Sequence, residues 1–177
     1  MPRRPPLAVL QFPDEFALAM PYPSFNVKDL HTVDEGVWAN VPTLLTERVG
    51  EWDVLVGHYL GVDHAGHVGD VDSPAMMAKL EQLDEQVEAI VRMLDAAAMP
   101  GMPHEDTLLV LLGDHGMTDT GDHGGGSPDE VESALWVYHP GAHWALTRAG
   151  GEWTWAGLAD ERICHLASVA RVMCVSA

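Results

Sequence analysis

The stretch Trp52-Asp-Val-Leu-Val-Gly-His-Tyr-Leu60 runs directly into Gly61-Val-Asp-His-Ala-Gly-His67, and this junction decides the fold. Residues 52–60 form a mostly apolar run, which predicts a strand that is buried on both faces, as parallel strands are. The glycine, aspartate and histidine residues that follow predict a loop at the strand's end. In open α/β sheets, ligands bind outside the carboxyl ends of the strands. The junction therefore indicates an α/β protein with a polar site at that edge.

The segments that follow predict a helix and a second strand. Ser73-Pro74 supplies a capping hydroxyl and then proline at the first helical position. Apolar residues recur at three- and four-residue steps up to Leu94, so we expect an amphipathic helix that ends near Ala98, with Lys79 on its wet face. Residues 106–112 predict a strand that is again buried on both faces. Strand, helix and strand form a βαβ unit, whose strands lie parallel as neighbours or near-neighbours.

The flanking segments carry weaker signals. Asp34 is expected to cap a helix that runs to Leu45, with Pro42 as a kink or a late start. Residues 133–139 predict a third strand. Residues 141–177 show no clean period, which leaves loop or disorder as the default. The expected fold class is thus α/β, with a mainly parallel sheet flanked by helices.

The composition limits the classes of function. The 177 residues suffice for one domain with a core, and 47% of them are apolar, which indicates a globular chain. With 9 basic and 27 acidic residues, the formal net charge is −18, which argues against a nucleic-acid partner. Acidic residues together with 10 histidines suit divalent cations better. No apolar run approaches the ~18–20 residues of a membrane span, and no targeting segment is indicated.

Aspartate and histidine residues cluster after both predicted strands. Leu60 leads into Asp63 and His67, and Leu112 leads into Gly113-Asp-His-Gly116, which is followed by Gly121-Asp-His-Gly-Gly125. Imidazole and carboxylate together suit Zn²⁺ or a similar transition ion. One ion cannot easily use all five candidates, whereas a pair of ions ~3.5–4 Å apart can clamp the two oxygens of a phosphoryl transfer. The candidate ligands are Asp63, His67, Asp114, His115 and His123.

Other histidines receive structural interpretations. A lone Asp-His-Gly is a common turn, but three Asp-His pairs after strands are unlikely to arise by accident. His64 and Asp122 lie beside candidate ligands, so we expect them to support those ligands through hydrogen bonds. His58, inside the first strand, is expected in the core. The remaining histidines are expected at the surface or in packing roles: His31, His104, His139, His143 and His165.

These motifs resemble a known family. Residues 58–67, Met77-Ala-Lys-Leu80, the strand from Asp106 with its Gly-Asp-His-Gly-Met-Thr, and Gly-Asp-His-Gly-Gly are similar to the GPI ethanolamine phosphate transferases of the alkaline-phosphatase superfamily. Pro21-Tyr-Pro-Ser-Phe-Asn-Val-Lys-Asp-Leu-His-Thr-Val-Asp34 adds to the match. The resemblance spans about residues 16–140, and the third-mannose branch is the most similar.

The resemblance implies an activity, a location and a set of metal ligands. The activity is transfer of phosphoethanolamine from phosphatidylethanolamine to a mannose of the GPI precursor, at the lumenal side of the endoplasmic reticulum membrane. Two divalent ions, for which Zn²⁺ is the best candidate, would serve as cofactors. Asp63, His67 and His123 would hold one ion, and Asp114 and His115 would hold the other. A small accessory membrane subunit is a further partner that the family implies.

The family's nucleophilic threonine and one more aspartate are expected upstream of Met1, together with a membrane anchor. We therefore expect residues 1–140 to be the C-terminal portion of a partial alkaline-phosphatase-like domain, and residues 141–177 to be a divergent tail. Thr43, Thr46, Thr118 and Thr120 are interpreted as structural, so no catalytic nucleophile is assigned. Without the upstream strand, the two predicted strands are expected to lack a neighbour. Three hypotheses remain: the transferase, a related metal-dependent phosphodiesterase or phosphatase, and an inactive metal-binding fragment.

Overall fold

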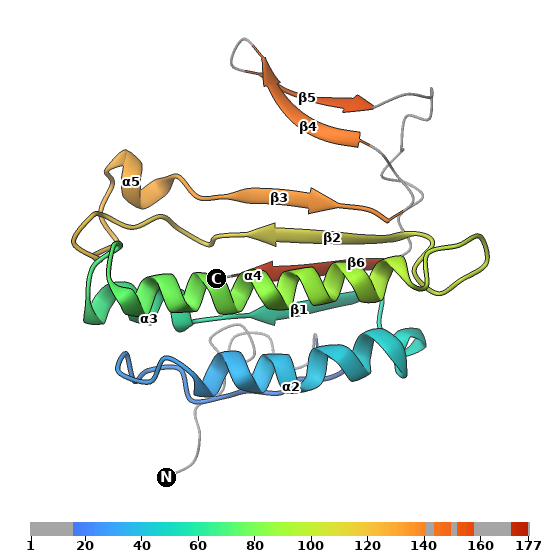
Figure 1. Cartoon of the computed structure of the whole chain (residues 1–177), viewed down its shortest axis with the longest axis horizontal. Helices are drawn as coiled ribbons and strands as arrows, with labels where there is room; N and C mark the ends of the chain where they lie inside the picture. The colour runs from blue at the N-terminus through green and yellow to red at the C-terminus, as the bar shows by residue number, and fades with distance from the viewer. Residues whose placement is uncertain (1–15, 141–143, 150–151, 158–170, 177) are drawn as a thin grey trace.

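The computed structural model describes residues 16–140, 144–149, 152–157 and 171–176. Figure 1 shows a layer of strands with helices packed against it. The elements, in chain order, are α2 (Thr32–Thr46), the short 3₁₀ helix η1 (Val49–Glu51), β1 (Val54–His58), α3 (Gly61–Val68), α4 (Pro74–Asp95), β2 (Thr107–Leu112), α5 (Pro128–Val131), β3 (Leu135–Tyr138), β4 (Trp144–Ala149), β5 (Glu152–Gly157) and β6 (Arg171–Ser176).

The main sheet has four strands in the order β1-β6-β2-β3. β1 and β2 both run parallel to β6, in register Val54↔Val172 and Thr107↔Arg171, and β3 runs antiparallel to β2. The βαβ prediction is confirmed, because β1 and β2 are parallel near-neighbours joined through α4 (Figure 1). The α/β class and the mainly parallel sheet are confirmed too. β4 and β5 form a separate antiparallel pair.

The strands β4, β5 and β6 were not predicted from the sequence. All three belong to residues 141–177, where loop or disorder was the default, and the two predicted strands were expected to lack a neighbour. The structure corrects both expectations, because β6 lies between β1 and β2 and pairs with each. A strand of six residues is too short for periodicity to distinguish it from other short apolar segments. β2 thus has partners on both sides, and β1 and β3 form the edges of the sheet.

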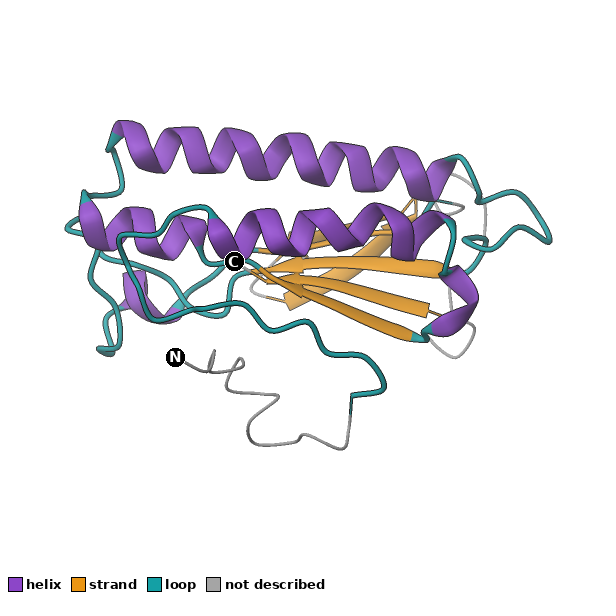
Figure 2. Ribbon diagram, turned by 90° about the horizontal axis from the view of Figure 1, so that it is seen from below, coloured by secondary structure: helices purple, strands orange, loops and turns teal. Residues whose placement is uncertain are grey.

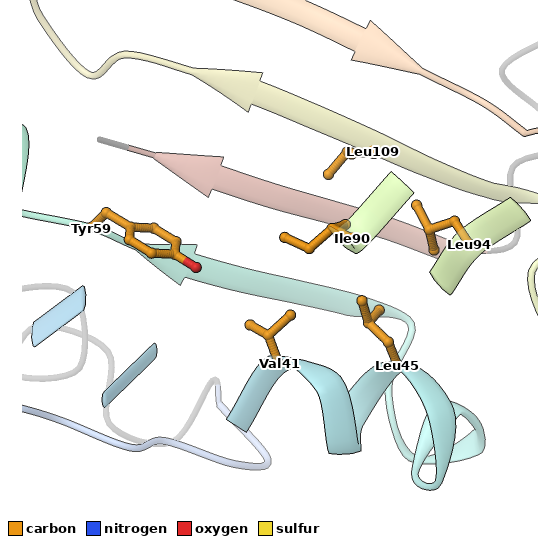
Figure 3. Packing of buried hydrophobic residues seen from close by; sticks show 6 residues of the cluster. All are labelled: Val41, Leu45, Tyr59, Ile90, Leu94 and Leu109. Carbon is orange, nitrogen blue, oxygen red and sulfur yellow. The ribbon is translucent and has the colours of Figure 1, made fainter. Parts of the chain in front are cut away.

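The core lies between one face of the sheet and the helices α2 and α4. Figure 2 shows the two long helices side by side on one side of the strands. Figure 3 shows how their side chains meet the sheet, in a cluster of six buried residues: Val41, Leu45, Tyr59, Ile90, Leu94 and Leu109. Each fully buried aliphatic side chain of this kind contributes roughly 1.5–3 kcal/mol. This cluster fixes β1 and β2, and with them the segments that follow each strand.

β1 departs from the expectation of burial on both faces. Val54 and Val56 are exposed, and so is His58, which was expected in the core. The reason is that the two described long helices cover one face only, so alternate residues of β1 face away from them. The prediction of a core histidine at position 58 is therefore wrong.

The start of α2 also differs from expectation. The Asp29 carboxylate accepts hydrogen bonds from the backbone N–H groups of His31 and Thr32, at 3.1 and 3.0 Å, so it satisfies the first turn. These bonds, with those from Thr32 foremost, lower the pKa of Asp29. Asp34 is not the cap of α2. Pro42 lies inside the helix, so a late start there is excluded.

α4 begins as predicted. The Ser73 hydroxyl accepts from the Met76 N–H at 3.2 Å, and Pro74 occupies the first turn. The helix ends at Asp95, slightly before the expected end near Ala98, which is within the usual variation of helix ends.

Candidate metal centre

Asp63 and His67 project from α3, the short helix that follows β1. The sequence predicted a loop here, and the structure forms an eight-residue helix. Residues four apart lie on the same helical face, so the helix brings these two side chains together. His67 Nε2 lies 3.6 Å from Asp63 Oδ1. Because Gly61 and Gly66 are poor helix formers, α3 needs support from elsewhere in the fold.

Asp34 supplies that support. Its Oδ1 accepts from the backbone N–H groups of Leu60 and Gly61, at 2.9 and 3.0 Å, so Asp34 caps α3 across the fold. Its Oδ2 lies 3.2 Å from Lys79 Nζ, and this lysine also donates to Gln82 at 2.8 Å. Lys79, expected on the wet face of α4, is only 3% exposed. The correction has a physical cause, since a long aliphatic stem can cross apolar surface to reach a buried carboxylate.

His64 fixes α3 from another side. Its Nδ1 donates to the Asp29 carbonyl oxygen at 2.9 Å, because a carbonyl can only accept. The ring is 3% exposed. This bond joins α3 to the loop before α2, and it goes to Asp29 rather than to one of the candidate ligands that His64 was expected to support.

His115 follows β2 and faces Asp63. Its Nδ1 donates to the Gly116 carbonyl at 2.9 Å, which leaves Nε2 with a free lone pair for a ligand. The Gly116 N–H bonds the Glu130 carbonyl at 2.9 Å. A side chain at position 116 would place Cβ 2.0 Å from the Asp129 carbonyl oxygen, so only glycine permits this approach.

A closed turn over residues 118–122 presents His123. Thr118 binds Asp122 through three bonds: its N–H donates to the Asp122 carbonyl, while its hydroxyl accepts from the Asp122 N–H and bonds that carbonyl. Gly121 has φ +80°, and a Cβ there would lie 2.0 Å from the Gly66 carbonyl oxygen. Glycine at 121 therefore lets the turn approach α3. The structural interpretation of Thr118 agrees with these bonds.

The three segments converge on Asp63. Its Oδ1 lies 3.0 Å from His123 Nε2 and 3.9 Å from His115 Nε2, in addition to His67. The His67 and His123 Nε2 atoms are 3.0 Å apart, and the His115 and His123 rings stack with centroids 3.9 Å apart. Asp63, His115 and His123 form a group whose ligand atoms all lie within 4.8 Å of one another. Asp63 therefore lies close to candidate ligands of both predicted ions: His67 and His123 from its own set, and His115 from the other.

These residues fit a divalent metal ion. Asp63 Oδ1 is buried and has no hydrogen-bond partner among the described residues, although a buried carboxylate oxygen normally has one. Imidazole nitrogens surround it, and neutral imidazoles with one carboxylate are a donor set that zinc prefers. A cation at the convergence would supply the missing partner of Oδ1. The group can therefore hold a metal ion.

The two remaining predicted residues, Asp114 and Asp122, are exposed. Asp114 is 43% exposed at its side chain, and its Oδ1 lies 3.9 Å from His115 Nε2. The Asp122 side chain is exposed, and its Oδ2 accepts a long hydrogen bond from the Thr120 hydroxyl at 3.5 Å. The structure thus brings Asp63, His67, His115 and His123 close together, with Asp114 beside them.

The histidines that were expected at the surface or in packing roles differ in burial. His31 is exposed, whereas His104 is buried and bonds the Leu45 carbonyl and the Thr107 hydroxyl, at 2.7 and 3.1 Å. His139 is half-buried, and its burial lowers its pKa. These three agree with surface or packing roles. His143 and His165 lie outside the described residues.

A pocket of about 270 Å³ opens beside the cluster. Asp63, His115 and Gly116 line it together with an apolar wall: Val62, Val71, Met76, Leu80 and Met117. No local pattern in the sequence signals this wall, and none signals the pairing of Asp34 with Lys79.

Comparison with known proteins gives matches over most of the chain. The model of a family described as type I phosphodiesterase / nucleotide pyrophosphatase matches residues 12–156. The chain is 48% identical over 132 residues to the human GPI ethanolamine phosphate transferase 3, catalytic subunit, covering 74% of this chain and 11% of that protein. It is 48% identical over 125 residues to the GPI ethanolamine phosphate transferase 3 of Eremothecium gossypii, covering 68% and 11%.

A second type of relative is also similar. The GPI ethanolamine phosphate transferase 2 of Saccharomyces cerevisiae is 38% identical over 130 residues, covering 73% of this chain and 15% of that protein. The chain therefore spans only about a tenth to a seventh of these relatives' lengths. No solved structure matches the chain. Within the described part, no helix is both long and apolar enough to cross a bilayer.

Proposed function

This chain belongs to the type I phosphodiesterase / nucleotide pyrophosphatase family, and we propose that the protein containing it transfers phosphoethanolamine from phosphatidylethanolamine to a mannose of the GPI precursor. The observation that carries the proposal is the buried, unpartnered Asp63 Oδ1, which is surrounded by the imidazoles of His67, His115 and His123. The identity to the two GPI ethanolamine phosphate transferases 3 supports the substrate class. The endoplasmic reticulum membrane, with a lumenal site, is the location proposed with it.

We assign two divalent ions, with Zn²⁺ as the best candidate, to this site. Asp63, His67 and His123 would hold one ion, and Asp114 and His115 would supply part of the shell of the other. Such a pair neutralises the charge that develops on the attacking and leaving oxygens of a phosphoryl transfer. His115 is prepared for its role, since its Nδ1 proton is held by the Gly116 carbonyl and its Nε2 lone pair faces Asp63.

The experiment compares His67→Ala and His115→Ala with His31→Ala in the full protein. We expect the first two to lose metal content and phosphoethanolamine transfer from labelled phosphatidylethanolamine to a mannose acceptor. His31→Ala, which removes an exposed imidazole, should leave both unchanged. Full metal content and full transfer in His67→Ala and His115→Ala would refute the ligand assignment.

A second candidate is hydrolysis, because the matching family is described as phosphodiesterases and pyrophosphatases. In that case water rather than a sugar hydroxyl accepts the phosphoryl group. The same assay separates the two candidates, because hydrolysis releases free phosphoethanolamine and leaves the mannose acceptor unmodified. Zinc binding without turnover of either kind would favour the third hypothesis, an inactive metal-binding chain.

A further inference from the structure

The lining of the pocket beside the metal centre combines two ionisable residues with apolar ones. Asp63 and His115 are the ionisable residues, and the apolar residues, which we call the wall, include Met76, Leu80 and Met117. Among the described residues that line it, no other side chain is ionisable. Its volume of about 270 Å³ exceeds the roughly 150 Å³ cavity that holds benzene, and falls near the lower end of whole-ligand pockets, about 300 Å³. The pocket therefore suits an apolar portion of a larger ligand.

The wall is part of the packing around α3. A Cβ at Gly66 would lie 2.1 Å from Met117 Sδ and 3.5 Å from Met76 Cε, so the bare backbone of α3 leaves the room that Met117 occupies. Met76 is buried, which fixes the inner part of the wall. Gly66 also lies one residue before His67. The same segment of α3 therefore packs against the pocket wall and carries a candidate metal ligand.

The apolar surface continues outward along α4. Leu80 is 44% exposed and Met77 is 51% exposed. Residues three apart on a helix are neighbours, so Met77 extends the rim that Leu80 begins. Exposed apolar surface next to a pocket is typical of a ligand or membrane contact.

We propose that this pocket holds the glycerol backbone and the first acyl methylenes of the phospholipid donor, while the donor's phosphate group lies at the Asp63–His115 end. The inference rests on the proposed function. A mannose in this pocket would leave several hydroxyls without partners, at a cost that an apolar wall cannot offset. The ethanolamine ammonium would likewise face thioether and aliphatic groups. The acyl-glycerol portion is the part of the reactants that matches the wall.

The experiment measures binding to the zinc-loaded chain by calorimetry. The probes are dihexanoyl phosphatidylethanolamine, below its micelle concentration, and glycerophosphoethanolamine, which has the same head group without acyl chains. We expect the lipid to bind more tightly, by roughly tenfold for every two methylenes that the pocket buries. Equal affinity for the two probes would overturn the pocket assignment and leave the proposed function standing. Failure of both probes to bind would also overturn the pocket assignment, and the transfer assay on the full protein tests the proposed function separately.

Leu80→Asn supplies the test within the chain, and Met99→Asn is its matched control. Both replace an exposed apolar side chain, but Met99 lies after α4 and does not line the pocket. We expect Leu80→Asn to weaken the lipid by at least threefold, leave glycerophosphoethanolamine unchanged and keep the circular dichroism spectrum. Met99→Asn should change neither affinity. An unchanged lipid affinity in Leu80→Asn, or a methyl mannoside whose binding depends on Leu80, would contradict the proposal.

Discussion

Asp34 and Asp63 are two carboxylates that act on the same short helix, and they differ in what neutralises them. Asp34, 6% exposed, is satisfied by two backbone N–H groups at the start of α3 and by Lys79. Asp63 projects from α3 itself, and its Oδ1 has no hydrogen-bond partner within the described part of the chain. Asp34 is thus a structural carboxylate whose counter-charge is part of the fold, whereas the described ionisable groups paired with Asp63 Oδ1 are imidazoles. We propose a metal ion as the counter-charge of the second carboxylate.

The largest expected effect comes from breaking the structural pair. Lys79→Met leaves Asp34 buried without a cation, and removing one partner of a buried pair costs about 3–5 kcal/mol. We expect urea unfolding to show a loss of that order in the free energy of unfolding. Lys28→Met, at an exposed lysine, is the control and should change stability by less than about 0.5 kcal/mol. Equal, small effects would mean that the Asp34–Lys79 pair does not support α3.

The next effect concerns the second carboxylate. Zinc at one hundred times its dissociation constant should raise the free energy of unfolding by about 2.7 kcal/mol, because it binds the folded state only. Asp63→Asn should abolish this gain and change the stability measured in EDTA by less, because without the ion Asp63 Oδ1 accepts no hydrogen bond from the described residues and only lies near imidazoles. Thermal unfolding with zinc or EDTA checks both points. A zinc gain that persists in Asp63→Asn would place the stabilising ion elsewhere.

A smaller effect tests how the His123 turn reaches Asp63. Gly121 and Gly101 both have φ +80°, but only at Gly121 would a Cβ meet backbone, 2.0 Å from the Gly66 carbonyl oxygen. Gly101→Ala should cost about 1 kcal/mol for the backbone conformation alone. Gly121→Ala should cost about 1–2 kcal/mol more and weaken zinc binding, because the turn has to move away from α3. Equal unfolding energies for the two variants would show that the close approach is dispensable.

The smallest effect concerns Tyr59, a buried hydroxyl without a hydrogen-bond partner in the described residues. Burial, and secondarily the charge of Asp34, raises the pKa of Tyr59. Since the unfolded tyrosine loses its proton near pH 10, stability is full below that pH and falls as the pH rises toward the folded pKa. Tyr59→Phe should be nearly neutral at pH 7 and should reduce this alkaline loss in urea unfolding between pH 8 and 11.

Part of the fall in the free energy of unfolding at alkaline pH should remain in Tyr59→Phe. Burial and the hydrogen bond to Asp95 raise the pKa of Tyr138 to about 12, so this second tyrosine also links stability to pH. If the free energy of unfolding of Tyr59→Phe fell with rising pH as steeply as that of the parent protein, the assignment of this loss to Tyr59 would be contradicted.

The sequence could predict what depends on local patterns. The apolar runs at 52–60 and 106–112, the Ser73-Pro74 start and the periodicity of α4 predicted the βαβ unit, and that unit predicted Asp63 and His115 at one edge of the sheet. Long-range pairings could not be predicted. Lys79 looked solvated because periodicity records residue type and cannot foresee that Asp34, 45 positions away, lies within reach.

β6 escaped prediction for a related reason. Its six residues carry no period of their own, and their place between β1 and β2 depends on parallel pairing with strands far away in the chain. The α3 helix was missed because its glycines weaken the local signal, although the spacing of Asp63 and His67 fits one helical face.

The most direct test of the metal centre is a zinc titration of the chain and its Asp63→Asn variant by isothermal calorimetry at pH 7.5. The account predicts saturable binding that EDTA reverses, and an affinity more than about 100-fold weaker in the variant, beyond the 10–100-fold typical of residues that only support a ligand. Absence of zinc binding, or equal affinity in both proteins, would contradict the assignment of Asp63 as the carboxylate at the centre of a metal site.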